Sequence, residues 1–374
     1  MRVTLGELVS LRRGNSYRGS LVGESGYPLL GLGTIAREGG FKGGKLRFYP
    51  EEFADRIAVS AGDVYVSLKD MTQEAALLGA AARVPEEIER ARLTQDTIAV
   101  DILDDSPISS EYLYWTLRSP QCRRHCKSLG TGTTNLDLAR NDFLSYEFEL
   151  PSLGEQRAIG EILGALDDKI AANRRVQRSI DDLLDASFRK ASRSTAERVE
   201  LGSLIALNYG KSLPSSKRVE GPFPVVGSGG VVGYHDESLV DGPAVIVGRK
   251  GSVGSTYWIS EGCFPIDTTY WVAPNGVSLG YAYRLLQDID FVAMNTDSAV
   301  PGLNRERAYA LQVPLPDGAH LEEFDRLSGA LTSKHSALQV ETSALARTRD
   351  ALLPLLMDGR IAVKDAEQAA EAVL

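Results

Sequence analysis

Cysteine is scarce in this chain, because only three occur among its 374 residues. They are too few and too unevenly spaced for a disulfide framework, so we expect a reducing, cytoplasmic compartment. Two of them, Cys122 and Cys126, lie in the segment C-R-R-H-C. A structural zinc site needs four ligands, and no second Cys/His pair stands at a finger-like spacing. We therefore interpret this segment as ordinary helix and expect no metal.

Long apolar runs and a basic surplus are also missing. No stretch approaches the length of a membrane span, and the N-terminus lacks the apolar core and cleavage site of a signal peptide. We accordingly expect no membrane partner. The net charge is −9, whereas nucleic-acid-binding domains often carry a basic surplus. Binding to a polyanion would therefore depend on where lysine and arginine cluster.

A large internal repeat is the main positive feature of the sequence. V-T-L-G-E-L-V-S-L-R-R-G-N-S-Y, from Val3 to Tyr17, is echoed by V-E-L-G-S-L-I-A-L-N-Y-G-K-S-L, from Val199 to Leu213. Three further pairs follow in the same order: Ala61 to Asp70 with Asp241 to Lys250, Thr94 to Val100 with Pro265 to Val272, and Tyr112 to Leu117 with Tyr281 to Leu286. The chain is therefore duplicated.

Each repeat begins with a region of short apolar runs. These runs predict strands at Val64–Leu68, Thr97–Val100, Ala244–Val247 and Thr268–Val272. Short helices are expected at Leu5–Leu11, Glu111–Ser119 and Leu279–Asp288. The pattern predicts a strand-rich, mixed α/β domain with helices at its edges, and hence the α+β class.

Each repeat ends in a long amphipathic helix of about 30 residues with coiled-coil spacing. The seam residues are Ile159, Leu166, Asn173 and Ile180, a second row of Leu163, Ile170, Gln177 and Leu184, and, in the second repeat, Leu331, Leu338, Leu345 and Leu352. An apolar stripe needs a partner, so we expect the helices to pack as a pair; alternatively, each completes its own domain. Asn173 would fix the register, and Pro354 is expected to end or bend the second helix.

Two glycine-rich loops imitate nucleotide-binding loops. In G-P-A-V-I-V-G-R-K-G-S-V-G-S-T, from Gly242 to Thr256, Lys250 precedes Gly251, whereas the lysine of a phosphate loop follows the last glycine. V-V-G-S-G-G-V-V-G, from Val225 to Gly233, has no acidic residue at the distance that a dinucleotide fold requires. We favour instead a loop laid against a DNA backbone, since glycine permits close approach and Arg249 supplies charge.

The ordered set of motifs resembles the specificity (S) subunits of type I restriction-modification systems over nearly the whole chain. The resemblance is carried by L-P-S-L-G-E-Q-R-A-I…A-L-D-D-K-I after Leu150, its weaker copy after Leu315, T-G-T-T-N-L (Thr131 to Leu136), V-P-G-L-N-R-E (Val300 to Glu306), V-G-R-K-G-S-V-G and F-P-I-D-T-T-Y-W-V. It implies two globular target-recognition domains separated by a pair of long antiparallel coiled-coil helices, related by a pseudo-twofold repeat. The implied segments are 1–150 (first recognition domain), 151–193 (first spacer helix), 194–316 (second recognition domain) and 317–374 (second spacer helix and tail).

The same resemblance implies the function. Each recognition domain would read one half of a bipartite, asymmetric target in double-stranded DNA, and the helix pair would set the gap. Two methyltransferase subunits would dock on the chain, and restriction–translocation subunits would join them. S-adenosylmethionine, ATP and Mg would sit on those partners, and none on this chain.

The chain also lacks residues suited to catalysis. It has no N-P-P-Y or D-P-P-Y methylation motif, no helicase nucleotide loop and no nuclease carboxylate–lysine set. Asp96 and Asp267 imitate catalytic acids, but at equivalent strand starts we interpret them as residues that cap turns or orient the recognition loops. We therefore expect a non-catalytic subunit; a stand-alone nucleic-acid enzyme and a coiled-coil adaptor that does not bind DNA are the alternatives.

The candidate DNA contacts are polar residues on loops that follow predicted strands or helices. They comprise Arg12, Arg13, Asn15, Tyr17, Lys69, Thr133, Thr134 and Asn135 in the first half, and Lys211, Arg249, Lys250, Ser252, Ser255, Asn304 and Arg305 in the second. Lys69 is expected to take the role of Arg249 and Lys250 in the first domain.

Overall fold

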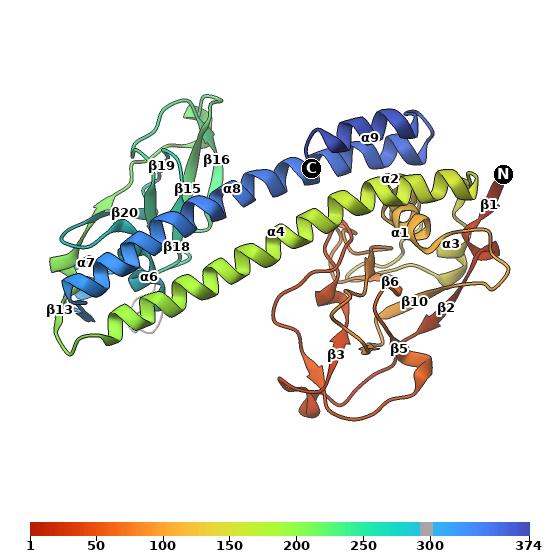
Figure 1. Ribbon diagram of the computed structural model, residues 1–374, viewed down its shortest axis with the longest axis horizontal. Helices are drawn as coiled ribbons and strands as arrows, with labels where there is room; N and C mark the ends of the chain where they lie inside the picture. The colour runs from red at the N-terminus through yellow and green to blue at the C-terminus, as the bar shows by residue number, and fades with distance from the viewer. Residues whose placement is uncertain (292–301) are drawn as a thin grey trace. The chain divides into compact units, whose positions relative to one another are not determined.

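Two long helices dominate the computed structural model, which describes residues 1–291 and 302–374. They are α4 (Leu153–Arg193) and α8 (Gly318–Met357), of 41 and 40 residues, and thus longer than the expected 30. The chain divides into two compact units. Unit 1 comprises Met1–Ala171 and Thr342–Leu374, and unit 2 comprises Ala172–Glu341. Each unit joins a strand-rich globular part to portions of both long helices (Figure 1).

The globular part of unit 1 is built on small sheets. Its main sheet has the order β2-β10-β6-β8, a second has the order β4-β3-β9-β5, and two pairs join β1 to β12 and β11 to β7. The strands are β1 (Arg2–Thr4), β2 (Val9–Arg13), β3 (Tyr27–Leu30), β4 (Phe48–Tyr49), β5 (Ala58–Val59), β6 (Val64–Ser67), β7 (Lys69–Asp70), β8 (Ala81–Arg83), β9 (Ala91–Leu93), β10 (Thr97–Ile102), β11 (Leu136–Asp137) and β12 (Glu147–Glu149). The shorter helices are α1 (Ser110–Arg118), α2 (Pro120–Ser128), α3 (Arg140–Leu144) and α9 (Val363–Glu371).

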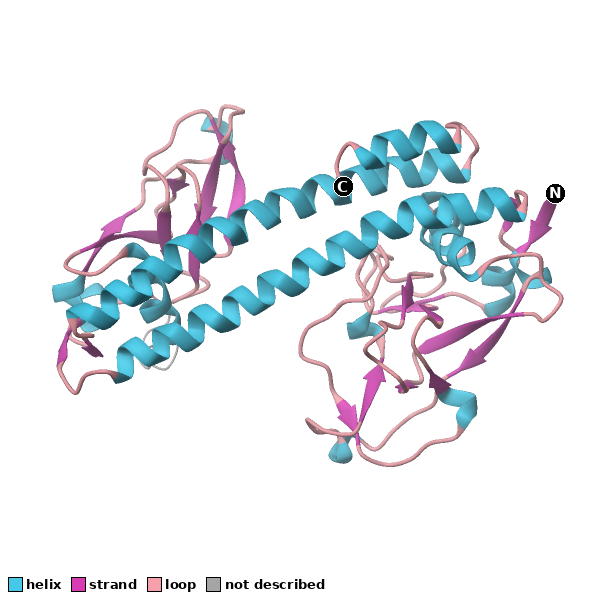
Figure 2. Cartoon of the chain, viewed as in Figure 1, coloured by secondary structure: helices cyan, strands magenta, loops and turns pink. Residues whose placement is uncertain are grey.

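Unit 2 repeats this plan. Its main sheet has the order β14-β20-β17-β18, beside a three-stranded sheet β16-β15-β19 and the pair β13-β21. Figure 2 shows the strands of both globular parts in magenta and the helices in cyan. The strands are β13 (Arg198–Glu200), β14 (Ile205–Tyr209), β15 (Phe223–Gly227), β16 (Gly230–His235), β17 (Ala244–Gly248), β18 (Thr256–Ile259), β19 (Phe264–Pro265), β20 (Thr269–Pro274) and β21 (Gln312–Pro314). The helices are α5 (Leu201–Leu204), α6 (Leu279–Asp288) and α7 (Arg305–Tyr309).

The apolar runs predicted as strands are buried on both faces of the main sheets. In β6, Val64 and Val66 face the core that includes α1, α2 and part of α4, whereas Tyr65 faces a second core under the smaller sheet. In β17, Val245 and Val247 face one core and Ile246 the other. A strand covered on both sides needs apolar residues at every position, which explains the continuous apolar sequence.

Within each unit the two long helices pack in opposite directions. In unit 2, α4 residues Asp181 and Lys190 pair with His335 and Glu323 of α8, so residue numbers rise along one helix as they fall along the other. The seam residues Ile180, Leu184 and Leu338 are buried together against half-buried Leu331. In unit 1, the buried cluster includes Ile159, Leu163, Leu166, Ile170, Leu345 and Leu352. The α+β class and the antiparallel helix pair are confirmed.

Asn173 and Gln177 complete the α4 seam. Asn173 is 4% exposed and Gln177 is half-buried. Both belong to unit 2, at the start of its portion of α4. A buried asparagine amide in a helix seam is costly unless it is hydrogen-bonded, and the Nδ2 of Asn173 has no hydrogen-bond partner among the described residues.

One expectation about an element needs correction. Residues 5–11 do not form one helix: a single 3₁₀ turn, Leu5–Glu7, is followed by strand β2. Pairing of Leu11 with Val100 across the sheet overrides the local helical pattern. Helix α8 ends at Met357, within one turn of Pro354, which agrees with the expectation that this proline would end or bend it. The domain limits predicted from the sequence stay a prediction, since each compact unit includes parts of both helices.

Candidate nucleic-acid interface

Several hydrogen bonds of the two main sheets are equivalent, which fixes how the repeats correspond. Gly14 N–H donates to Thr97 O in unit 1, and Gly210 N–H donates to Thr269 O in unit 2. Leu138 N–H donates to Leu68 O, as Leu303 N–H does to Arg249 O. Leu68 therefore corresponds to Arg249, and Lys69 to Lys250. The sequence alignment, which set Lys69 against Arg249, was shifted by one residue.

Further correspondences follow from the strand registers. Arg13 pairs with Ile98 in β2–β10, and Tyr209 pairs with Tyr270 in β14–β20, so Arg13 corresponds to Tyr209. The Thr97 and Thr269 hydroxyls donate to the carbonyls of Thr94 and Ile266. Gln95 thus corresponds to Asp267, and Asp96 to Thr268. Asp96 and Asp267 are therefore not equivalent.

A pocket of about 220 Å³ opens where these strands end in unit 1. It is lined by three cationic side chains, Arg13, Lys69 and Arg140, and by the carboxylates of Asp96 and Asp137. Arg13 is exposed, and its Nε donates to the Gln95 carbonyl at 3.0 Å. Lys69 lies between the two carboxylates, with Nζ 3.6 Å from an oxygen of each. The pocket thus contains one arginine, Arg13, that is held by a backbone carbonyl, and one lysine, Lys69, whose charge is neutralised by two carboxylates.

The remaining candidates of β2 and its following loop are tied into the protein. Arg12 forms a two-bond ion pair with Asp101 at 2.9 Å, and this hydrogen bonding raises the pKa of its guanidinium. Asn15 accepts a hydrogen bond from buried Arg92, and the Tyr17 hydroxyl accepts one from Arg47. Arg12 would have to leave Asp101 to contact DNA. Asn15 and Tyr17 are engaged only as acceptors, so the Asn15 amide N–H and the Tyr17 O–H remain as donors.

Thr133, Thr134 and Asn135 form the exposed tip of a tight loop. Backbone bonds between Thr131 and Asp137 in both directions close its base. Gly132 has a φ of +130°, and a Cβ there would lie 2.0 Å from the Asn135 carbonyl, so only glycine fits. No hydrogen bond joins the three tip side chains to any described residue. The loop presents two hydroxyls and an amide to solvent.

In unit 2 the corresponding surface is aromatic as well as cationic. Tyr209 is 50% exposed, and the Arg249 and Arg305 guanidiniums lie 4.8 and 5.2 Å from its ring centre. Arg249 Nη1 donates to the Asp267 carbonyl at 3.0 Å. Beneath them lies Tyr270, whose pKa is raised by burial. An exposed ring beside two guanidiniums is a surface on which a base or a phosphate can rest.

Lys250 and its neighbours supply further donors. Lys250, Lys211 and Ser252 are exposed, and their side chains have no hydrogen bond or ion pair with the described residues. Ser255 is half-buried. Among the described residues Lys250 has no carboxylate partner, unlike Lys69, since Thr268 and Gly302 stand where unit 1 has Asp96 and Asp137. Within the described residues, the charge of Lys250 is therefore less compensated than that of Lys69.

Asn304 has a different local role, because its side-chain oxygen accepts the N–H of Arg307 and caps α7. The motif V-P-G-L-N-R-E begins at Val300 and Pro301, which lie outside the described residues.

Two residues at this surface were missed from the sequence. Arg140 begins α3 as Arg305 begins α7, and Tyr209 replaces Arg13. The repeat contained the signal: aligning L-A-R-N-D (Leu138 to Asp142) with L-N-R-E-R (Leu303 to Arg307) pairs the two arginines.

The glycine-rich segment of unit 2 turns one strand into another. It joins β17 to β18, which pair antiparallel from Ala244↔Ile259 to Val247↔Thr256. A nucleotide phosphate loop instead leads from a strand into a helix, whose N-terminus receives the phosphates. The nucleotide interpretation fails on topology as well as on the position of Lys250.

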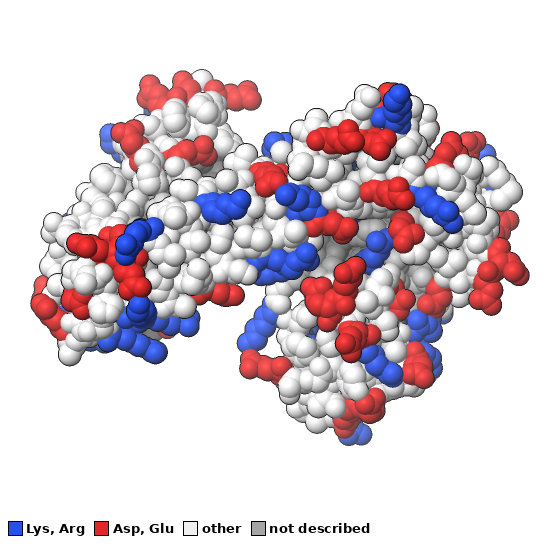
Figure 3. All heavy atoms as spheres, in the orientation of Figure 1, with Lys and Arg blue, Asp and Glu red and all other residues white. Residues whose placement is uncertain are grey.

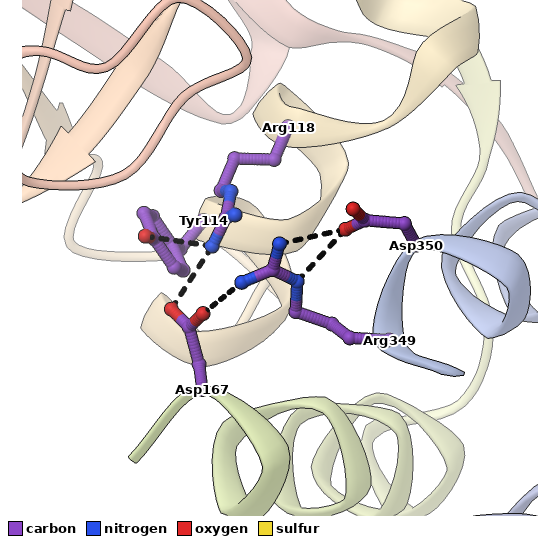
Figure 4. A network of polar contacts seen from close by, with 5 residues as sticks. All are labelled: Tyr114, Arg118, Asp167, Arg349 and Asp350. Carbon is purple, nitrogen blue, oxygen red and sulfur yellow. Dashed lines mark hydrogen bonds and ion pairs between the residues drawn. The ribbon is translucent and has the colours of Figure 1, made fainter. Parts of the chain in front are cut away.

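Each globular part is fastened to α4 by an arginine from the helix after its main sheet. In unit 1, Arg118 of α1 donates to Asp167 at 3.0 Å and to Tyr114, and Asp167 also pairs with Arg349 of α8 (Figure 4). Burial opposes ionisation of Asp167, but the two guanidiniums outweigh it and hold the pKa of Asp167 below its usual value. In unit 2, Arg284 of α6 bonds Asp181 and Asp185.

Charge is interspersed on the face shown in Figure 3, where blue and red side chains alternate. Cys122 and Cys126 lie on α2 and are fully buried. Among the described residues, no group of His, Cys, Asp and Glu side chains is arranged to hold a metal ion. None of the described helices combines the length and apolarity that crossing a membrane requires.

Comparison with known proteins identifies relatives. Residues 2–181 match the family model described as Type I restriction modification DNA specificity domain. A putative type I specificity subunit from Mycoplasma genitalium is 24% identical over 287 residues, which cover 70% of this chain and 74% of that protein. The specificity subunit of the Escherichia coli type I restriction enzyme EcoprrI is 24% identical over 151 residues, 36% of this chain and 37% of that protein.

A solved structure shares the fold. The crystal structure of a type I restriction-modification S subunit from M. genitalium superimposes with a TM-score of 0.66 at 20% identity, covering 96% of each chain. The resemblance inferred from the sequence motifs is confirmed.

Proposed function

We propose, from the match of residues 2–181 to the type I restriction modification DNA specificity domain, that this chain is the DNA-reading subunit of a type I complex. Each unit reads one half of a bipartite, asymmetric target. The α4–α8 pair sets the unread gap and offers docking surfaces for two methyltransferase subunits. Restriction–translocation subunits join this assembly in the cytoplasm.

The observation that carries the proposal is that the two main sheets have the same main-chain frame, meaning equivalent strands and backbone hydrogen bonds, but different side chains at equivalent positions. The main sheets of the two units have equivalent main-chain hydrogen bonds, yet equivalent positions hold Arg13, Leu68 and Asp96 in unit 1 and Tyr209, Arg249 and Thr268 in unit 2. Because base edges are read by side chains and not by the frame, different side chains imply different half-sites. An asymmetric target follows.

The chain's own residues bind and position DNA, and they leave chemistry to partners. Guanidinium, ammonium, amide and hydroxyl groups at the ends of the sheets are donors suited to phosphates and base edges. S-adenosylmethionine, ATP and Mg belong to the methyltransferase and restriction subunits in this scheme. In the complex those subunits would add to the DNA clamp, which reconciles binding with a net charge of −9.

Two measurements test the proposal. The tagged chain, purified from its native host, should retain an adenine methyltransferase. Sequencing of methylated bases with and without the gene should show one gapped, asymmetric adenine motif that disappears on deletion. An unchanged methylome together with no copurifying methyltransferase would refute it. Methylation or cleavage by the purified chain alone would favour a stand-alone enzyme, and a complex without DNA affinity would favour an adaptor.

A further inference from the structure

In each unit an arginine donates to the same equivalent backbone carbonyl, but the two arginines come from strands on opposite sides of the central strand. In unit 1, Arg13 Nε donates to Gln95 O at 3.0 Å, and in unit 2, Arg249 Nη1 donates to Asp267 O at 3.0 Å. Gln95 and Asp267 are equivalent, yet Arg13 and Arg249 are not. Arg13 ends β2, one neighbour of the central strand β10, whereas Arg249 follows β17, the other neighbour of the equivalent strand β20.

The equivalent position in the other unit holds a different residue in each case, so the arginine has changed strands between the two units. Where unit 2 has Arg249, unit 1 has Leu68, which is 5% exposed in the core. Where unit 1 has Arg13, unit 2 has Tyr209, whose ring lies beside the Arg249 guanidinium. Each unit therefore keeps one guanidinium at this carbonyl and supplies it from a different strand. A guanidinium that served only to satisfy the carbonyl would not need a solvent-facing position, because water satisfies such a group.

The anchoring bond leaves one complete recognition edge on each arginine. Arg13 uses Nε, which leaves the Nη1–Nη2 edge. Arg249 uses Nη1, which leaves the Nε–Nη2 edge. No other hydrogen bond or ion pair joins either side chain to the described residues. Both remaining edges match two adjacent acceptors, and the O6 and N7 atoms of guanine in the major groove are such a pair.

We propose that Arg13 and Arg249 each read a guanine, one in each half-site, with the equivalent carbonyls of Gln95 and Asp267 fixing the guanidinium before DNA arrives. This inference rests on the proposed function and adds the residues that determine specificity. Anchoring lowers the side-chain entropy lost on binding, so affinity is gained without additional contacts, while the bidentate contact to guanine supplies the discrimination. Each substitution should therefore relax one position of one half-site.

The test uses the complete chain with its methyltransferase, since methylation of the target is the readout. Arg249→Leu reproduces the unit 1 residue and removes the guanidinium. Arg249→Leu combined with Tyr209→Arg transfers the guanidinium to the strand used in unit 1. The 50% exposure of Tyr209 makes the second change tolerable. Arg198→Ala is the matched control, because this exposed arginine of unit 2 also donates to one backbone carbonyl, that of Gln312.

The methylome should give a sharp result. Arg249→Leu should make one guanine position of one half-site degenerate, with a loss of discrimination of about 5- to 150-fold, as expected for one bidentate arginine–guanine pair. The double variant should restore the guanine, and Arg198→Ala should change nothing. Arg13→Ala should relax a guanine in the other half-site. An unchanged motif in Arg249→Leu would overturn the inference, while the wild-type motif itself would still support the proposed function.

Binding measurements cover the case in which methylation is abolished. Fluorescence anisotropy would compare the wild-type target with single-base variants of each half-site. Equal affinities for guanine and its replacements in Arg249→Leu would support base reading. A uniform loss of affinity that preserves the guanine preference would instead assign Arg249 to a phosphate and would overturn the inference. Melting temperatures of the variants would confirm that the fold is intact.

Discussion

Replacing Asp167 with asparagine tests whether the charge cluster in Figure 4 stabilises unit 1. Asp167 accepts hydrogen bonds from Arg118 and Arg349, whose side chains are 5% and 12% exposed. Asparagine keeps the shape and one acceptor oxygen but removes the negative charge. Two largely buried guanidiniums would then share no counter-ion on α4. Removing one partner of a buried ion pair costs about 3–5 kcal/mol.

The lower end of that range is appropriate here. The Asp167 side chain is 28% exposed, so water screens part of the interaction. We therefore expect Asp167→Asn to lower the free energy of unfolding of unit 1 by about 3 kcal/mol near pH 7. Because folding lowers the pKa of Asp167, the stability that it contributes is present above the unfolded pKa of about 4. It is lost as the pH falls through the lower folded value, and the variant and wild type should converge there.

Urea unfolding followed by tryptophan fluorescence provides the measurement. Trp115 is buried in unit 1, and the other two tryptophans, Trp258 and Trp271, lie in unit 2. In a background with both changed to phenylalanine, fluorescence reports unit 1 alone. Glu147→Gln is the control, since its ion pair with Arg2 is exposed and should add little. A loss below about 1 kcal/mol in Asp167→Asn, the level of exposed pairs, would refute the assigned role.

Three further results are expected. Asn173→Leu should raise stability by about 1–3 kcal/mol in urea unfolding, because it removes a buried amide without a hydrogen-bond partner; a loss would contradict this. Lys250→Ala should reduce the slope of log affinity against log salt by about 0.9, and Lys69→Ala by less, because two carboxylates already neutralise Lys69; equal changes would argue against that difference. Seven residues inserted after both Ala171 and Glu341 should widen the methylated motif's gap by about 3 base pairs, since a helix rises 1.5 Å per residue and keeps its phase over a heptad; an unchanged gap would rule out the ruler.

The elements with strong periodic patterns were predictable. The strands at β6, β10, β17 and β20 and the helices α1 and α6 lie within two residues of their predicted limits. Continuous apolar runs and heptads record burial directly, since burial on two faces or along one stripe leaves a period in the sequence. The helix predicted over residues 5–11 failed, because the cross-strand pairing that makes Val9–Arg13 a strand is not a local property.

The candidate surface was predicted only in part, for a related reason. Exposed polar residues were found, but their partners were not: nothing local in the sequence indicates that Arg12 is held by Asp101 or that Lys69 lies between Asp96 and Asp137. Lys69 and Asp137 are 68 positions apart in the sequence, and Arg12 and Asp101 are 89 positions apart. The one-residue error at Lys69 arose from insertions between the repeats, which only the hydrogen-bond register resolves.

The same register explains how two unlike readers can share one frame. The equivalent bonds run between main-chain groups, so they do not depend on which side chain occupies positions 13 and 209 or 68 and 249. Glycine is the exception: a Cβ on Gly14 would lie 2.1 Å from Thr94 O, and one on Gly210 would lie 2.2 Å from Ile266 O. A side chain there would displace the turn that carries the arginine-binding carbonyl. The main-chain frame therefore requires glycine at these two positions but tolerates different side chains at the positions that would contact DNA. Each half-site can thus change independently of the other.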